Sequence, residues 1–341
     1  MSFARNLTTL AMTITLFVPA LVAQADPLPG RDLLKFSQKP MDGTPIVTPD
    51  GTTGRFFGHD ELSTAWGSPD ASGATIYQGR FMADDFADQL NSPVVHVKWW
   101  GSYLENQIFQ PVDKFLISFE SDVPADPLAG FSRPGEPLLN QIVRRGPLSP
   151  GSGTFTEKPI SPGGPPLDEK LYEYNAELHL DKPFPEDNDT VYWLKIVALV
   201  DVADIGVPMT QWGWHNRDYT IPNPLASPLV VPGERIVGDL PGGEPIWHFQ
   251  DNAVEGSVFV DTAGPNGAKM PVIDQADYQP TDYINGIDGP AGIAGTDFPG
   301  IGRFSKDLAF EIYTTVPEPT SIVMASLGLF AMIGWLRFQR V

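Results

Sequence analysis

Cysteine is absent from the 341-residue chain. The absence excludes a disulfide framework, a cysteine nucleophile and thiolate metal sites. Basic residues are scarce as well, because 22 Lys and Arg stand against 42 Asp and Glu, a formal net charge of −20. So acidic a surface repels nucleic acid and anionic lipid, and no nucleic-acid partner is expected. The composition suits an extracellular protein, and a chain of this length can bury an apolar core without disulfides.

Recognisable catalytic motifs are missing too. The chain has no Gly-x-Ser-x-Gly elbow, no His-Glu-x-x-His and no Walker loop. Two of its five scattered histidines, His96 and His179, fall on the polar faces of predicted strands, where we expect solvated side chains. Adjacent carboxylates such as Asp84 and Asp85 would point to opposite faces of a strand, and Glu173 and Glu177 are expected on the solvent face of theirs. We therefore expect a non-enzymatic body, and a catalytic triad assembled only in the folded chain stays an open alternative.

Helical periodicity is lacking in the body, whereas nine segments alternate apolar and polar residues or are continuously apolar. The predicted strands lie within residues 75–81, 95–103, 115–119, 138–144, 172–180, 191–200, 211–219, 253–260 and 308–312. Segment 191–200 is apolar on both faces apart from Lys195, which is typical of a central strand. The pattern predicts an all-β fold, an antiparallel β-sandwich or jelly roll over residues 75–315. Residues 26–74 are expected to form an extended N-terminal lead-in or an extra edge layer.

Glycine and proline are abundant, at 33 and 35 residues, and they concentrate between the predicted strands. Three long Pro- and Gly-rich stretches, residues 146–166, 221–245 and 262–302, are predicted to be loops. Loops of this length inside a compact domain tend to be functional or mobile.

The N-terminus has the pattern of a secretory signal peptide. Arg5 precedes an uncharged, apolar run over residues 7–23, and Ala23 and Ala25 form a small-x-small cleavage site. We expect cleavage after Ala25, which removes residues 1–25 from an exported chain.

The C-terminus carries a second apolar segment. Residues 320–336 are uncharged and, as a helix, would cover about 25 Å of a hydrocarbon core that is about 30 Å thick. Pro317 and Pro319 would end this helix on the outer side, and Arg337 and Arg340 favour a cytoplasmic C-terminus. The sequence therefore predicts a single C-terminal transmembrane helix.

The order of Pro317-Glu318-Pro319, an apolar segment and terminal arginines resembles the PEP-CTERM sorting signal. The resemblance covers residues 316–341, with one departure, since two residues separate Arg337 from Arg340, whereas the family usually has consecutive arginines. It implies processing by an exosortase, a membrane protease-transpeptidase of Gram-negative bacteria that make exopolysaccharide. The expected locations are an inner-membrane-anchored precursor and then the cell surface or the extracellular matrix of a biofilm.

The body also resembles an uncharacterised family of secreted bacterial proteins. The resemblance rests on seven motifs in order: residues 83–86 (ADDF), 99–103 (WWGSY), 131–135 (FSRPG), 192–194 (YWL), 212–214 (WGW), 251–254 (DNAV) and 308–311 (LAFE). It implies an exported β-sandwich and assigns no catalytic residue.

Three further hypotheses concern ligands of the body. Trp212 and Trp214 would share one strand face and could stack on sugar rings, as in a carbohydrate-binding module, with core packing as the ordinary alternative. Asp187 and Asp189 lie in an acidic turn and Asp288 in a Gly-rich loop, and their oxygens could bind a structural Ca²⁺, although Asp is also an ordinary turn former. No other cofactor is expected. A secreted glycan-active enzyme, with two carboxylates across a cleft, is the third alternative.

Overall fold

The computed structural model describes residues 32–40, 44–47, 53–56, 60–124, 127, 132–160, 170–179, 183–203, 207–218, 221–229, 235–239, 245–248, 253–262, 279–280, 282–284, 303–305 and 307–315. Strands dominate these residues, and the one helical element among them is a 3-10 turn at Leu104–Asn106, so the all-β prediction is confirmed. No helix in this part of the chain is long and apolar enough to cross a membrane. The predicted signal peptide, the sorting motif and the predicted transmembrane segment lie outside the described residues.

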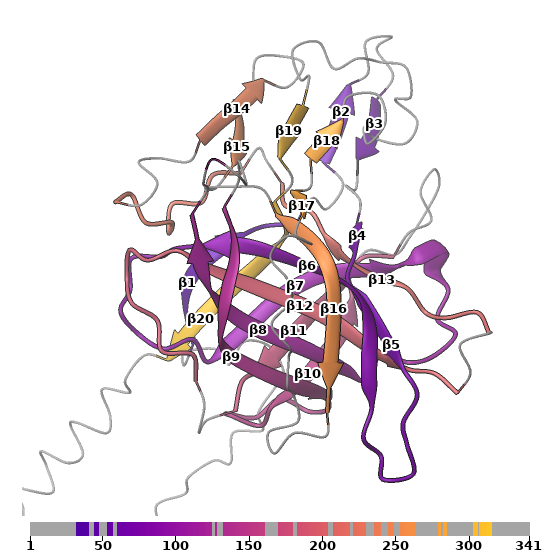
Figure 1. Ribbon diagram of the computed structural model, residues 1–341. Helices are drawn as coiled ribbons and strands as arrows, with labels where there is room; N and C mark the ends of the chain where they lie inside the picture. Colours follow the sequence, from indigo (N-terminus) through magenta and orange to yellow (C-terminus); the bar gives the residue numbers. More distant parts are fainter. Residues whose placement is uncertain are drawn as a thin grey trace, which may run out of the picture.

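One sheet of 14 strands makes up most of the described structure (Figure 1). Its strands are β1 (Asp32–Gln38), β4 (Asp60–Leu62), β5 (Thr64–Gly67), β6 (Ile76–Phe86), β7 (His96–Tyr103), β8 (Lys114–Val123), β9 (Arg133–Arg145), β10 (Thr154–Pro159), β11 (Tyr172–Glu177), β12 (Tyr192–Asp201), β13 (Trp212–His215), β16 (Val254–Asp261), β17 (Gln279–Pro280) and β20 (Phe310–Thr315). Three separate two-stranded pairs join β2 (Thr44–Val47) to β3 (Thr53–Phe56), β14 (Arg235–Asp239) to β15 (Pro245–His248), and β18 (Asp282–Ile284) to β19 (Arg303–Ser305).

Each of the nine predicted segments overlaps a strand of the large sheet. The central position predicted for residues 191–200 is confirmed, because β12 pairs with β8 along one edge and with β5 and β6 along the other. The apolar residues of β12 pack on both faces of the sheet, and this two-sided burial explains why its sequence shows no alternation.

The structure differs from the sequence-based prediction in several places. The sheet is mixed rather than purely antiparallel, because β12 runs parallel to β5 and β9 runs parallel to β10. Strands β1, β4 and β5 belong to the large sheet although they precede residue 75. Strand β10 lies within the stretch predicted as a loop over 146–166, β14 within 221–245, and β17 and β18 within 262–302. Strands of two to six residues are too short to show a clear alternation beside the surrounding prolines and glycines.

The strand pairings form a closed circuit. It runs through β7, β11, β10, β9, β8, β12 and β5, and then through β4 and β13 back to β7. Ser63 joins β4 to β5: its N–H donates to the carbonyl of Trp212 (3.1 Å), and its carbonyl accepts from the N–H of Ala198 (2.9 Å). One face of these strands therefore surrounds a single core.

Aromatic rings fill that core. Phe115 is central, with ring centroids 4.9 Å from Trp212, 5.0 Å from Phe155, 5.2 Å from Trp99 and 5.2 Å from Tyr174. Most of these contacts are edge-to-face, the arrangement that the charge distribution of aromatic rings favours.

A second apolar cluster lies on the opposite face of β12. Trp193 and Val197 pack there with Phe81 of β6 and Val258 of β16. Within this cluster Lys195 and Glu120 form an ion pair, with 2.7 Å between Nζ and Oε1 and both side chains 1% exposed. A charged pair is thus enclosed by apolar groups.

The first and last described strands of the chain are neighbours. β1 pairs with β20 in antiparallel register (Figure 1). Asp32 stands opposite Thr315 in this pair. β20 in turn pairs with β7, from Phe310 opposite Trp99 to Tyr313 opposite His96. The two ends of the body therefore leave the sheet at the same place.

Candidate functional site

The outward face of β7, β11 and β20 carries a ladder of polar side chains. His96 stands opposite Glu177 on β11 and Tyr313 on β20, while Lys98 stands opposite Asn175 and Glu311. The predicted division of β7 into two faces is confirmed, since Val97 and Trp99 lie in the core. The expectation that His96 is solvated is wrong, because the residue is 0% exposed.

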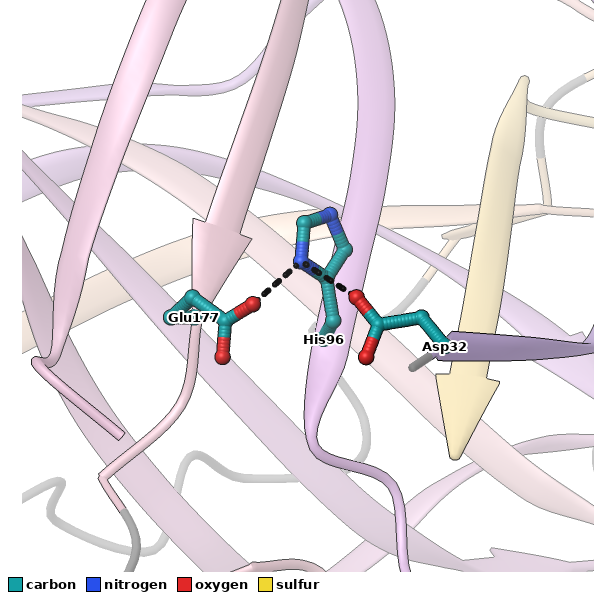
Figure 2. Close-up of side chains that lie close together, drawn as sticks. All are labelled: Asp32, His96 and Glu177. Atoms are coloured by element: carbon teal, nitrogen blue, oxygen red, sulfur yellow. Dashed lines mark hydrogen bonds and ion pairs between the residues drawn. The ribbon is translucent and has the colours of Figure 1, made fainter. Parts of the chain in front are cut away.

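Two carboxylates approach the imidazole of His96 (Figure 2). Nδ1 of His96 lies 3.0 Å from Oε1 of Glu177 and 3.8 Å from Oδ2 of Asp32, and the three side chains are at most 1% exposed. Among the described residues these three form a group whose ligand atoms all lie within 4.8 Å of one another. Strand pairing positions all of them, because Asp32 begins β1, His96 begins β7 and Glu177 ends β11.

The other side of the imidazole is held by Asn175. Nε2 of His96 lies 3.1 Å from Oδ1 of Asn175, whose Nδ2 donates to Glu173 at 3.0 Å. The amide oxygen is therefore the acceptor, and the Nε2–H of His96 donates to it. The ring of Tyr313 meets the imidazole edge-on at a centroid distance of 5.3 Å, and the backbone N–H of Gly151 approaches Oε2 of Glu177 at 3.5 Å.

A charged row continues along the same face. The carboxylate of Glu311 accepts hydrogen bonds from Lys39, Ser37 and Tyr313. Burial opposes ionisation of Glu311, but the hydrogen bonds from Lys39 and Tyr313 outweigh it and hold its pKa below the ordinary value. The Nζ of Lys98 lies 2.9 Å from Glu173 and 5.2 Å from the ring centroid of Trp100, so this row is ion-paired throughout.

A Ser, a His and an Asp also meet, but in an order unlike a catalytic triad. Asp60 sits in the middle: it accepts a hydrogen bond from Oγ of Ser102 and lies 2.6 Å from Nδ1 of His215. A nucleophilic triad needs the histidine between the serine and the acid, so that the imidazole can remove the hydroxyl proton. This arrangement instead fastens β4 to β7 and β13.

The two adjacent aspartates of β6 are both buried. The carboxylate of Asp84 accepts from the N–H of Leu308 at 2.7 Å. Burial and the neighbouring Asp307 raise the pKa of Asp84 well above its ordinary value, although Arg217 pairs with Asp307 at 3.1 Å. The contact ties β6 to the segment that precedes β20.

The predicted calcium ligands lie apart from the His96 cluster. Asp187 is exposed, and the carboxylate of Asp189 accepts hydrogen bonds from Asn188 and Ser227, while Asp288 lies outside the described residues.

The turn that holds Asp187 and Asp189 also contributes a buried carboxyl group. Glu186 lies 3.1 Å from Nζ of Lys35, and burial together with Asp88 raises the pKa of Glu186 to about 9.

The predicted glycan-stacking pair is in the core. Trp212 and Trp214 share one face of β13, as predicted, but both are 0% exposed. Their indole N–H groups donate to the hydroxyl of Tyr174 at 3.0 Å and to the carbonyl of Ala309 at 2.9 Å. The proposed platform is therefore wrong, because no indole face is open to a sugar, and the carbohydrate-binding hypothesis loses the site on which it rested.

Several sequence motifs of the body contact one another. The glycine of residues 99–103 leaves room for the tryptophan of residues 212–214, because a Cβ on Gly101 would lie 2.6 Å from Cε2 of Trp212. Asp122 accepts hydrogen bonds from Ser132 at 2.9 Å and from the indole of Trp193 at 2.9 Å. With the Asp84–Leu308 contact, these pairs join six of the seven motifs, and the joined residues hold strands together.

Comparison with known proteins places the body in a family. Neither the curated proteins nor the solved structures contain a match to the chain at the significance required. The family described as Domain of unknown function (DUF7901) matches residues 34–230, more than half of the chain and most of the circuit of strands from β4 to β13. The match also begins within β1, ahead of residue 75. The chain belongs to this family, Domain of unknown function (DUF7901).

Proposed function

We propose that the chain is an exported, exosortase-sorted protein of the cell envelope or exopolysaccharide matrix, with a non-enzymatic β body. The body would be a two-faced, sandwich-like structure, and residues 320–336 would cross the inner membrane of a Gram-negative bacterium until the tail is cleaved. The observation that carries the proposal is the order of the sequence signals, with a cleavable leader over 1–25 and a Pro-Glu-Pro tail over 316–341.

The arrangement of the body supports this topology. Asp32 and Thr315 stand opposite each other in the β1–β20 pair, so both terminal segments start from one place on the sheet. Six residues separate the expected mature N-terminus from Asp32, and four separate Thr315 from the uncharged segment. Extended chains of these lengths reach about 20 Å and 14 Å. A precursor held by both ends in one membrane therefore needs no rearrangement of its strands.

The polar side chains of the body support a structural role. The buried ion pair of Lys195 with Glu120 and the part-buried hydrogen bonds of Asp60 with Ser102 and His215 join strands of the sheet. Groups engaged in this way position the backbone rather than a substrate. The body in this proposal is a stable unit delivered to the surface, with exopolysaccharide as the expected partner.

Two measurements test the proposal in the producing bacterium. Mass spectrometry of the exported protein should find Asp26 as the first residue, and deletion of residues 317–341 should release the body as soluble protein. Glu318→Gln should leave precursor in the membrane, whereas Glu136→Gln, at an exposed glutamate of the body, should be processed like the wild type. Equal distribution of all four proteins would refute the sorting function.

A further inference from the structure

We propose that Asp32, His96 and Glu177 bind a divalent first-row transition ion such as Zn²⁺. The three side chains come from β1, β7 and β11 and converge on one point beside the imidazole (Figure 2). The inference concerns the folded body alone and does not depend on how the chain is sorted.

Charge balance is the first argument. Two carboxylates, each about 1% exposed, face Nδ1 of the histidine. With a neutral imidazole the three side chains carry a charge of −2, and with an imidazolium they carry −1. A divalent ion between the two carboxylates would match their combined charge and leave the imidazole neutral.

The orientation of the imidazole is the second argument. The Nε2–H donates to Oδ1 of Asn175 at 3.1 Å, so a neutral His96 presents the lone pair of Nδ1 to the two carboxylates. Three electron-pair donors that face one another repel unless a proton or a metal cation lies between them, and a metal ion can bind all three at once. Metal-binding histidines characteristically donate their second ring N–H to an oxygen acceptor, and Asn175 fills that position.

The spacing is the third argument. Zn²⁺ binds nitrogen and oxygen at about 2.0–2.2 Å, which places neighbouring ligands of a tetrahedral site about 3.4 Å apart. The observed distances from Nδ1, 3.0 Å to Glu177 and 3.8 Å to Asp32, lie on either side of that value. The third separation is at most 4.8 Å, so small side-chain rotations complete the geometry. Three protein ligands leave one position for water.

The ligand set also indicates the class of ion. Imidazole nitrogen suits Zn²⁺ and other first-row divalent ions, whereas Ca²⁺ takes six to eight oxygens and Mg²⁺ keeps several waters. The consequence for the fold is local. A bound ion would fasten the first residue of β1 to β7 and β11, at the place where both ends of the body leave the sheet.

The test uses the full chain purified in detergent and freed of metal with a chelator. Isothermal titration with ZnCl₂ should show one site, and the same ion should raise Tm, because an ion that binds only the folded state stabilises it. CaCl₂ and MgCl₂ at the same concentration should give neither effect. Zinc X-ray absorption of the loaded wild-type chain should show one imidazole with oxygen ligands.

Variants separate this site from surface binding. His96→Gln should abolish the stoichiometric site, and Asn175→Ala, which removes only the acceptor for Nε2–H, should weaken the Kd about 10- to 100-fold. His179→Gln, at an exposed histidine, is the matched control and should bind like the wild type.

Three results would overturn the proposal: no zinc binding by the wild-type chain, a zinc shell without imidazole, or equal binding by His179→Gln and a folded His96→Gln. The first two use the wild type, so the proposal stays testable even if the His96 variant fails to fold.

Discussion

Replacement of Lys195 by Met tests the energetics of the second core. Lys195 on β12 pairs with Glu120 on β8 at 2.7 Å, and both side chains are 1% exposed. The ammonium also lies 4.2 Å from the ring centroid of Phe81, and Oε1 of Glu120 accepts from Ser118 at 2.9 Å. The variant therefore leaves a carboxylate in an apolar cluster without its cation.

The expected loss is about 3–5 kcal/mol in the free energy of unfolding, the usual result when one partner of a buried pair is removed. The double variant Lys195→Met, Glu120→Leu should recover most of that loss, because two apolar side chains need no compensating charge. It should fall within about 1–2 kcal/mol of the wild type, with the hydroxyl of Ser118 as the remaining cost.

Urea unfolding of residues 26–315, followed by tryptophan fluorescence, measures both values. Lys114→Met is the matched control on the same two strands: Lys114 pairs with Asp201 at 2.7 Å, but the Asp201 side chain is 44% exposed. We expect the control to cost about 1 kcal/mol or less. The reasoning fails if Lys195→Met costs no more than Lys114→Met, or if the double variant is as unstable as the single one.

Three further predictions follow from buried residues. Trp212→Ala and Trp214→Ala should each cost about 3–5 kcal/mol in urea unfolding, because both rings are fully buried, and a loss below about 1 kcal/mol would contradict their core position. Gly101→Ala should cost at least about 1–3 kcal/mol, because the added methyl meets the Trp212 ring and the Gly213 backbone; an unchanged Tm would disprove this close approach. Glu186 holds its proton to about pH 9 in the folded state, against an ordinary pKa of 4.5. The native state therefore binds more protons between these values, and stability should fall as pH rises through that window, by at most about 1.4 kcal/mol per unit. Glu186→Gln should remove that slope, and a pH profile identical to the wild type would refute the assignment.

The sequence predicted the strands and their faces better than it predicted their neighbours. Period-two alternation separates Val97 and Trp99 from His96 and Lys98 within one strand, and the structure confirms that separation. Alternation does not tell which strand lies beside β7. The contact of His96 with Glu177 depends on the register of β7 with β11, which no local pattern encodes.

The alternation of apolar and polar residues also did not determine which side chains are buried. Trp212 and Trp214 share a face by spacing alone, but whether that face meets solvent or core depends on β4 and β7, which enclose β13 on its two edges. His96 and Glu177 were predicted to face solvent because apolar and polar residues alternate along their strands. They are buried because β1, whose partner is the last described strand of the body, brings Asp32 against them.

That pairing gives the assembly of the proposed metal site an order. Among the described strands β1 pairs only with β20, and β20 holds its place by pairing with β7. His96 and Glu177 meet as soon as β7 pairs with β11, whereas Asp32 reaches them only after residues 310–315 have joined the sheet. The contact between Asp32 and His96 depends on the β1–β20 pair, which joins the two ends of the body and has the largest sequence separation of the strand pairs in the sheet. Forming that pair therefore has the highest loop-closure cost. A bound ion would offset part of that cost at the strand pair that completes the fold.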